Sequence, residues 1–187
     1  MSLFLNFAMF YVGWFSCVVG AARGRLWLGP AVAAALLIVH LALTPGRATE
    51  ARLILIAGFF GFAVDTALAS AGLFAFTQTS VAPWLSPLWM VALWMLFAAT
   101  LNSSMSWLAG CYGLAAVLGA LFGPVSYAAG ARLGAIDLPD RWIASLAGVA
   151  VVWAFAMPTL LVLRDWLSTT ATERPLRCSA SAMEVVK

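Results

Sequence analysis

Charged residues are scarce in this chain of 187 residues. Lys and Arg number ten and Asp and Glu seven, which makes 9% of the chain charged, against roughly 25% in an average soluble domain. Hydrophobic residues make up 64%, and the mean hydropathy is +1.01. So few charges cannot cover the surface of a soluble domain of this size. The composition therefore excludes a soluble enzyme, a nucleic-acid-binding module and a disordered chain, and it is typical of a polytopic integral membrane protein.

Side chains that bind metal ions are also few. His40 is the only histidine, and Cys17, Cys111 and Cys178 form no CxxC pair. Because a zinc or redox centre needs cysteines and histidines at short spacing, the sequence predicts no metal site. It identifies no cofactor either.

The amino-terminal segment lacks the basic region of a signal peptide, because no Lys or Arg precedes Arg23. Its apolar run of about 20 residues also exceeds the roughly 7–15 residues of a signal-peptide core. We therefore expect a retained first transmembrane helix.

Apolar segments of about 20 residues recur along the chain, and each is long enough for a helix to cross roughly 30 Å of hydrocarbon. The stretch over residues 88–131 is too long for one span, so a break is expected near residues 110–113. The predicted spans cover residues 3–22, 26–43, 53–73, 88–108, 114–131 and 142–163. They predict an all-α fold, a six-transmembrane-helix bundle over residues 1–163. Residues 164–187 contain many Ser and Thr and are predicted to form a mobile tail.

The distribution of arginine predicts an orientation. With six spans, five arginines lie on the side of the amino terminus, namely Arg47, Arg52, Arg164, Arg174 and Arg177. Four lie on the other side, namely Arg23, Arg25, Arg132 and Arg141. Because basic residues accumulate in cytoplasmic loops, this small excess predicts that both termini are cytoplasmic. The preference for Arg over Lys, with the Ala and Gly content, indicates a GC-rich bacterial genome.

Small residues and tryptophans predict how the helices pack. Gly119 and Gly123 are four residues apart, a spacing that lets helix backbones approach closely in lipid. Tryptophans near the ends of the spans are expected to act as interfacial anchors; they are Trp27, Trp84, Trp89, Trp107, Trp142 and Trp166. Trp14, Trp94 and Trp153 lie deeper and face either a cavity or lipid.

Asp65 is the most conspicuous candidate functional residue, since it lies near the middle of a predicted span. A carboxylate at that depth is costly, and ionisable residues in membranes commonly carry function. Asp65 with His40 could form a catalytic or proton-carrying pair, and the alternative is a structural hydrogen bond. Asn6 and Asn102 lie toward the same side of the membrane as His40 and are candidate ligand-binding residues. We expect Asn102 to lie close to Asp65 inside the bundle.

The opposite side of the membrane holds a second candidate group, formed by Arg23 and Arg132 with Tyr127 just inside. A guanidinium group suits phosphate or carboxylate, so a lipid head group is a natural ligand, with Trp89 as a further contact. A carboxylate such as Asp137 is the other partner considered for Arg132. The alternative for both arginines is simple snorkelling to the interface.

Several short motifs resemble a bacterial membrane family known as domain of unknown function 2878. They are Asn6-Phe7, Trp14-Phe15, Gly20-Ala21-Ala22-Arg23-Gly24, Trp27-Leu28-Gly29-Pro30, Pro87-Leu88-Trp89, Leu93-Trp94, Thr100-Leu101-Asn102-Ser103-Ser104, Gly123-Pro124, Tyr127 and Gly130-Ala131-Arg132-Leu133-Gly134-Ala135. The resemblance covers about residues 4–163 and implies a small multi-pass inner-membrane protein. Members of that family often lie beside genes for cyclopropane-fatty-acid-synthase-like proteins, which implies a membrane-lipid setting and no particular reaction.

Three functions of different classes remain open from the sequence. The first is binding or modification of a membrane lipid or fatty-acyl group. The second is a non-catalytic accessory subunit that stabilises a membrane partner, either another protein or a second copy of the chain. The third is a small proton-coupled transporter that uses Asp65 and His40. Whether the protein is an enzyme stays open.

Overall fold

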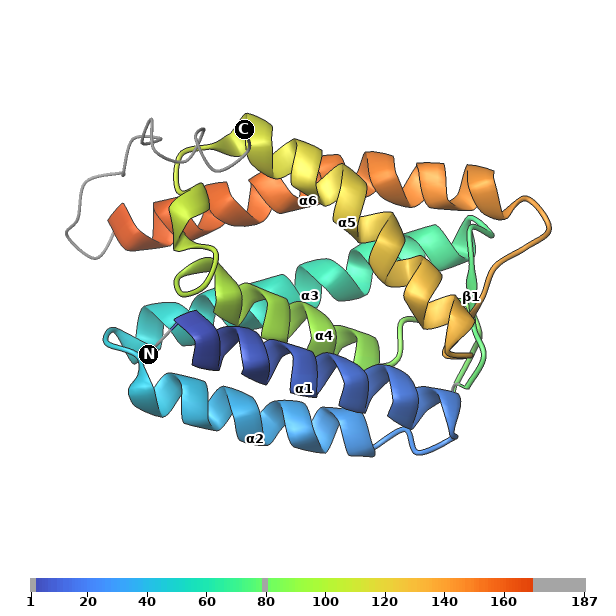
Figure 1. The fold of residues 1–187 in the computed structure, drawn as a ribbon, viewed down its shortest axis with the longest axis horizontal. Coiled ribbons are helices and arrows are strands. Elements are labelled where there is room, and N and C mark those ends of the chain that lie inside the picture. Colours follow the sequence, from blue (N-terminus) through green and yellow to red (C-terminus); the bar gives the residue numbers. More distant parts are fainter. Residues whose placement is uncertain (1–2, 79–80, 170–187) are drawn as a thin grey trace.

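The computed structural model describes residues 3–78 and 81–169, and these residues form a bundle of helices (Figure 1). The long helices are α1 (Leu3–Ala22), α2 (Leu28–Leu43), α3 (Arg47–Ser70), α4 (Leu88–Leu101), α5 (Tyr112–Arg132) and α6 (Trp142–Thr169). A short 3₁₀ helix, η1 (Ser106–Leu108), follows α4. The prediction of a helical fold is confirmed.

Four of these helices, α1, α3, α5 and α6, are long and apolar enough to cross a membrane. Helices α2 and α4 are apolar but have only 16 and 14 residues. At 1.5 Å per residue they extend over about 24 and 21 Å, less than the roughly 30 Å of a hydrocarbon core. The described residues thus form six long helices, four of them of spanning length.

The observed helix ends differ most from the predicted ones where polar residues lie near them. Helix α3 begins at Arg47, since Gly46 turns the chain with a φ of 73° and the helix continues through Glu50 and Arg52. Helix α4 ends at Leu101 instead of residue 108, because small polar residues follow whose side chains compete with helical backbone bonds. Helix α6 extends through residues 164–169, which the sequence predicts to belong to the tail. The rest of that tail, residues 170–187, lies outside the described residues.

Helix α4 is the centre of the bundle. It contacts the hairpin of α1 and α2 on one side and α3 on another, while α5 and α6 pair with each other (Figure 1). No residue of α4 from Trp89 to Leu101 is exposed. A helix that is apolar all round is typically buried, which explains why the shortest of the six helices lies inside.

A two-stranded antiparallel sheet joins two loops at one end of the bundle. Strand β1 (Ala75–Phe76) follows α3, and strand β2 (Ile136–Asp137) follows α5. The hydroxyl group of Thr77 also donates to the carbonyl of Gly134 at 2.8 Å. The sequence predicts only loops here, because strands of two residues are too short to show alternation. We call this end the sheet end and the other, which holds His40, the His40 end.

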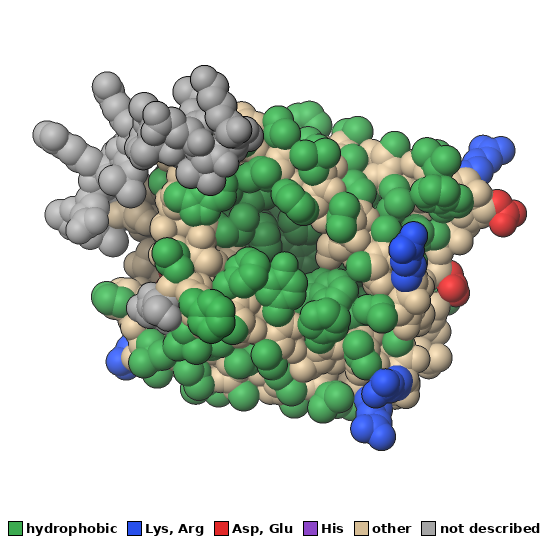
Figure 2. Space-filling view, viewed as in Figure 1, with side chains coloured by type: hydrophobic (Ala, Val, Ile, Leu, Met, Phe, Trp, Pro, Cys, Tyr) green, Lys and Arg blue, Asp and Glu red, His purple; other side chains and the backbone are tan. Residues whose placement is uncertain are grey.

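The outer surface has the polarity expected of a membrane protein. Figure 2 shows hydrophobic side chains over the flank and basic and acidic side chains at the ends, above all at the sheet end. Exposed tryptophans lie at or near helix ends, as predicted for interfacial anchors: Trp27, Trp84, Trp107, Trp142 and Trp166. Trp89 is the exception, because only 2% of it is exposed. The prediction that it anchors at the interface is wrong.

The small residues predicted to mediate packing do so between α5 and α6. A methyl group on Gly119 would overlap the carbonyl oxygen of Trp153, and one on Gly123 would overlap its indole ring. Glycine at both positions therefore allows the close contact of this helix pair.

Candidate functional site

Asp65 lies at the centre of the bundle and is completely buried. Nε1 of Trp94 on α4 donates to Oδ2 of Asp65 at 2.7 Å, and the hydroxyl group of Tyr127 on α5 donates to Oδ1. Each carboxylate oxygen thus accepts a hydrogen bond from a different helix. The hydrogen bonds of the structural interpretation of Asp65 are therefore present, and its carboxylate joins α3, α4 and α5.

Two tryptophans and a glycine position this carboxylate. The ring of Trp94 stacks on that of Trp153 with centroids 4.6 Å apart and planes 15° apart. A methyl group on Gly61, one turn before Asp65, would overlap the Trp94 ring. The indole can therefore lie flat against α3 only because residue 61 has no side chain. The depth of Trp94 is predictable, but its partner is not, since the sequence does not indicate which helices adjoin.

Tyr127 belongs to this buried group. Only 5% of the residue is exposed, and its ring packs on Phe74 with centroids 5.1 Å apart. Trp89 is likewise buried, with its ring edge-on to Phe76 at 5.8 Å. In this conformation neither side chain reaches a ligand at the surface, so the prediction that they contact a head group is not met by the geometry.

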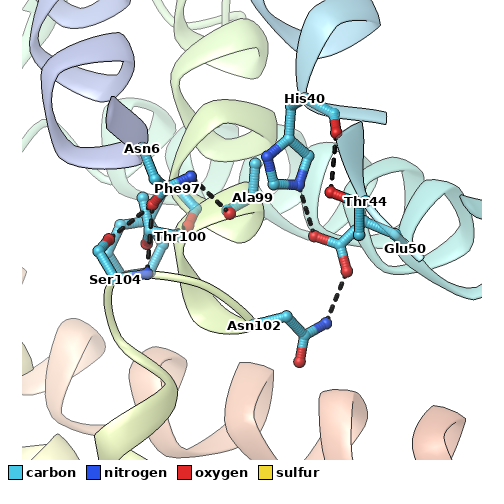
Figure 3. Close-up of polar contacts among 9 residues, drawn as sticks. All are labelled: Asn6, His40, Thr44, Glu50, Phe97, Ala99, Thr100, Asn102 and Ser104. Atoms are coloured by element: carbon cyan, nitrogen blue, oxygen red, sulfur yellow. Dashed lines mark hydrogen bonds and ion pairs between the residues drawn. The ribbon is translucent and has the colours of Figure 1, made fainter. Parts of the chain in front are cut away.

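A second polar group lies at the His40 end (Figure 3). Nε2 of His40 lies 2.8 Å from Oε1 of Glu50, with both residues buried, so that the ring N–H donates to the carboxylate. The amide of Asn102 donates to the other oxygen of Glu50 at 2.6 Å. Glu50 is absent from the predicted site residues, because the charges around it indicate a loop. The buried pair joins α2 to α3, and Asn102 links it to the end of α4.

Asn6 on α1 caps the same end of α4. Its amide donates to the carbonyl of Ala99 at 3.1 Å, and its oxygen accepts from the hydroxyl group of Ser104 at 2.6 Å (Figure 3). The last carbonyl groups of a helix have no partner within the helix. Side chains from neighbouring helices supply those partners here, which allows a short helix to end in an apolar environment.

A small cavity of about 10 Å³ lies between α1, α2 and α4, bordered by Asn6, Leu37 and His40. Nδ1 of His40 is buried and forms no hydrogen bond with a described residue. A cavity of this size holds about one water molecule. It is too small for any organic ligand, so this group of residues stabilises the bundle end and leaves no room for a substrate.

Asp65 and His40 belong to separate groups, contrary to the predicted relay. Glu50, the partner of His40, and Asp65 are both on α3 and 15 residues apart, a separation of about 22 Å along a helix. The expected proximity of Asn102 to Asp65 is wrong for the same reason. Asn102 is an exposed residue, and its amide is directed at Glu50.

Arg164 is a further buried polar residue, although the sequence predicts it to lie in the tail. Its Nη1 donates to the carbonyl of Leu101 at 3.0 Å, and its Nη2 pairs with Oδ1 of Asp165 at 2.5 Å. The hydroxyl group of Tyr112 donates to Oδ2 of the same aspartate at 2.7 Å. These bonds join α6 to the ends of α4 and α5. Arg164 is therefore a structural residue of the bundle as well as a positive charge at its end.

The sheet end brings the two predicted arginine-bearing segments together. Arg23 follows α1, and Arg132 is the last residue of α5; both are exposed. A methyl group on Gly134 would lie 3.9 Å from Cβ of Ala22. Ala22 adjoins Arg23 and Gly134 is two residues after Arg132, so the two chain segments lie side by side. Neither arginine forms an ion pair with a carboxylate among residues 3–78 and 81–169, Asp137 included.

Metal ligands do not gather anywhere in the described part of the chain. No group of three or more His, Cys, Asp or Glu residues there could hold a metal ion.

Apolar helices of spanning length, a hydrophobic flank and charged ends together define a helical membrane protein. The sequence profile of the family described as "Protein of unknown function (DUF2878)" matches residues 3–159. The chain belongs to this family, which confirms the resemblance seen in the motifs. Comparisons with curated proteins and with solved structures gave no match.

Proposed function

We propose that the protein binds a membrane phospholipid, with the phosphate held by Arg23 and Arg132 at the sheet end. The observation that carries this proposal is the pair of exposed arginines on adjoining chain segments, neither of which pairs with a described carboxylate. A guanidinium group donates two parallel hydrogen bonds to a phosphate. Two such groups at the end of a hydrophobic flank match the chemistry of a lipid head group.

The flank below Arg132 supports the same ligand. Leu121, Val125 and Arg132 are spaced by four and seven residues, so they share one face of α5. Leu121 and Val125 are 58% and 61% exposed. An acyl chain from a phosphate at Arg132 would run along this face. The distance from Arg132 to Leu121 is about 16 Å along the helix, which is roughly one leaflet of the hydrocarbon core.

Binding is favoured over modification of a lipid. Asp65 and His40, the candidate catalytic residues, are buried with their own partners and lie away from the two arginines. Their separation also weighs against a proton-coupled transporter that uses the two residues as a relay. An accessory subunit remains the alternative, since exposed hydrophobic side chains on the flank suit a partner helix as well as lipid.

The location that we propose is the inner membrane of a bacterium, with six membrane crossings and both termini in the cytoplasm. The two short helices, α2 and α4, would then cross as shortened spans. Their ends would be supported by the polar side chains around Glu50 and Asn6. The sheet end would face the periplasm, and the bound lipid would belong to the outer leaflet.

Native mass spectrometry of the protein purified in mild detergent tests the proposal. We expect the wild-type protein to retain phospholipid, and the double variant Arg23→Ala/Arg132→Ala to retain less of it. Arg47→Ala/Arg52→Ala removes the same charge at the His40 end and is the matched control, expected to retain the lipid. Equal retention by both double variants would refute the proposal. Co-purification of a protein partner without lipid would favour the accessory subunit.

A further inference from the structure

A pocket of about 580 Å³ opens at the sheet end, between the turn after α3 and the first two turns of α6. Its wall includes Leu73 from that turn, Asp140 and Arg141 just before α6, and Ala144, Ser145 and Gly148 within α6. The volume is within the range of small-molecule sites, roughly 300–1,000 Å³. None of the lining residues is Arg23 or Arg132, and nothing in the proposed function uses the pocket.

The polar side chains of the pocket are an aspartate, an arginine and a serine. Asp140 and Arg141 are exposed, and neither forms an ion pair with another residue that the structure describes. Ser145 is only 5% exposed and forms part of the pocket wall. The wall thus offers one anion, one cation and one hydroxyl group to a ligand.

The apolar part of the pocket lies deeper along α6. A methyl group on Gly148 would overlap Cδ2 of Leu73, so the glycine allows the leucine to form the floor. Ala144 and Gly148 are one turn apart and present little side chain of their own. The pocket is thus charged at its mouth and apolar toward the membrane interior, which is the polarity of a lipid at the interface.

We propose that this pocket binds a zwitterionic phospholipid whose head group carries a primary ammonium, of the ethanolamine type. Arg141 donates to the phosphate, the carboxylate of Asp140 accepts from the ammonium, and Ser145 donates to a phosphate or ester oxygen. The glycerol and first methylene groups lie against Leu73 and Ala144. Asp140 and Arg141 together carry no net charge. An anionic head group is therefore disfavoured, because Asp140 would repel it. The inference goes beyond the arginine pair and rests on the proposed function only in taking the ligand to be a membrane lipid.

The test compares phosphatidylethanolamine with phosphatidylglycerol in titrations of the detergent-solubilised full chain, read by native mass spectrometry. We expect the wild-type protein to prefer phosphatidylethanolamine. Asp140→Asn should weaken its binding about fivefold, as expected for one exposed charged contact, and should remove the preference. Asp137→Asn removes a carboxylate at the same end outside the pocket and should leave the preference unchanged. Arg141→Gln should weaken both lipids, whereas Arg25→Gln should weaken neither.

A steric variant makes the assignment independent of charge. Ala144→Phe fills the pocket and should abolish the preference, while Ala147→Phe, on an exposed position of the same helix, should keep it. Equal binding of both lipids by the wild-type protein, or equal effects of the Asp140 and Asp137 variants, would overturn the inference. Lipid binding that depends on Arg23 and Arg132 but not on the pocket variants would leave the proposed function standing and overturn this site alone. Competition by soluble glycerophosphoethanolamine as strong as that by the lipid would show a soluble ligand and overturn the lipid assignment.

Discussion

Asp65 accepts hydrogen bonds from two helices without any access to solvent. A side chain that fills the space but accepts no hydrogen bond leaves two buried donors unpaired, at about 1–3 kcal/mol each. We therefore expect Asp65→Leu to lower the thermal unfolding temperature in detergent more than Tyr127→Phe does. Asp65→Asn keeps one acceptor oxygen and should fall between wild type and Asp65→Leu. An exposed control on α3 is Ala63→Leu. If Asp65→Leu unfolded at the wild-type temperature, the hydrogen-bonded role of the carboxylate would be wrong.

His40 and Glu50 form a pair that a double-mutant cycle can measure. Residues in direct contact show coupling energies of about 0.5–3 kcal/mol, whereas distant residues add within about 0.3–0.5 kcal/mol. We expect His40→Ala and Glu50→Ala to couple in denaturant unfolding, and His40→Ala and Asp65→Ala to add. A coupling of His40 to Asp65 as large as its coupling to Glu50 would contradict the separation of the two groups and support the relay.

At the scale of the element, α4 depends on small residues and on side chains from its neighbours. Gly61→Ala should destabilise the bundle by about 1–3 kcal/mol, because the added methyl group overlaps the Trp94 ring and forces it to move. A methyl group on Gly113 of α5 would meet no atom within 4 Å. Gly113→Ala should be neutral or slightly stabilising, since alanine is the better helix former. Thermal unfolding of both variants checks this, and equal effects would contradict the packing of Trp94 against α3.

The helices themselves are predictable from the sequence, and their ends are less so. Apolar runs of about 20 residues identify helices because lipid or a buried core requires such runs. A charged residue usually marks the end of a membrane span. The sequence therefore predicts that Glu50 lies in a loop and that Arg164 lies in the tail. Both lie inside helices, where a partner from another helix offsets the burial of their charge. Which partner each residue has depends on the arrangement of the helices, and one sequence does not contain that arrangement.

At the scale of the whole molecule, charge at two ends and a hydrophobic flank predict the topology. In a background with Cys17, Cys111 and Cys178 replaced by alanine, Ala48→Cys marks the His40 end and Gln78→Cys the sheet end; both positions are exposed. With six crossings and cytoplasmic termini, a membrane-impermeant thiol reagent added to whole cells should label Gln78→Cys and not Ala48→Cys. The opposite labelling would reverse the orientation, and labelling of both would contradict the number of crossings.

The candidate site is only partly predictable from the sequence, because one sequence does not contain the arrangement of the helices. Arg23 and Arg132 are recognisable as cations near span ends, and the structure brings their segments side by side through Ala22 and Gly134. Depth alone assigns Tyr127 and Trp89 to the same site, yet they point into the core. The pocket beside Ser145 has no signal in the sequence, because a turn after α3 forms part of its wall.

The central claim is that a phospholipid binds at the sheet end, and photo-crosslinking in the native membrane tests it most directly. A phospholipid with a photoreactive group near its head group would be activated in membranes that contain the protein, and the modified peptides would be identified by mass spectrometry. We predict that the adducts are concentrated in the segments that contain Arg23, Arg132 and Arg141. In the Arg23→Ala/Arg132→Ala variant, the adducts in the first two of these segments should be lost. Adducts spread evenly over both ends of the bundle, or confined to the His40 end, would contradict the account.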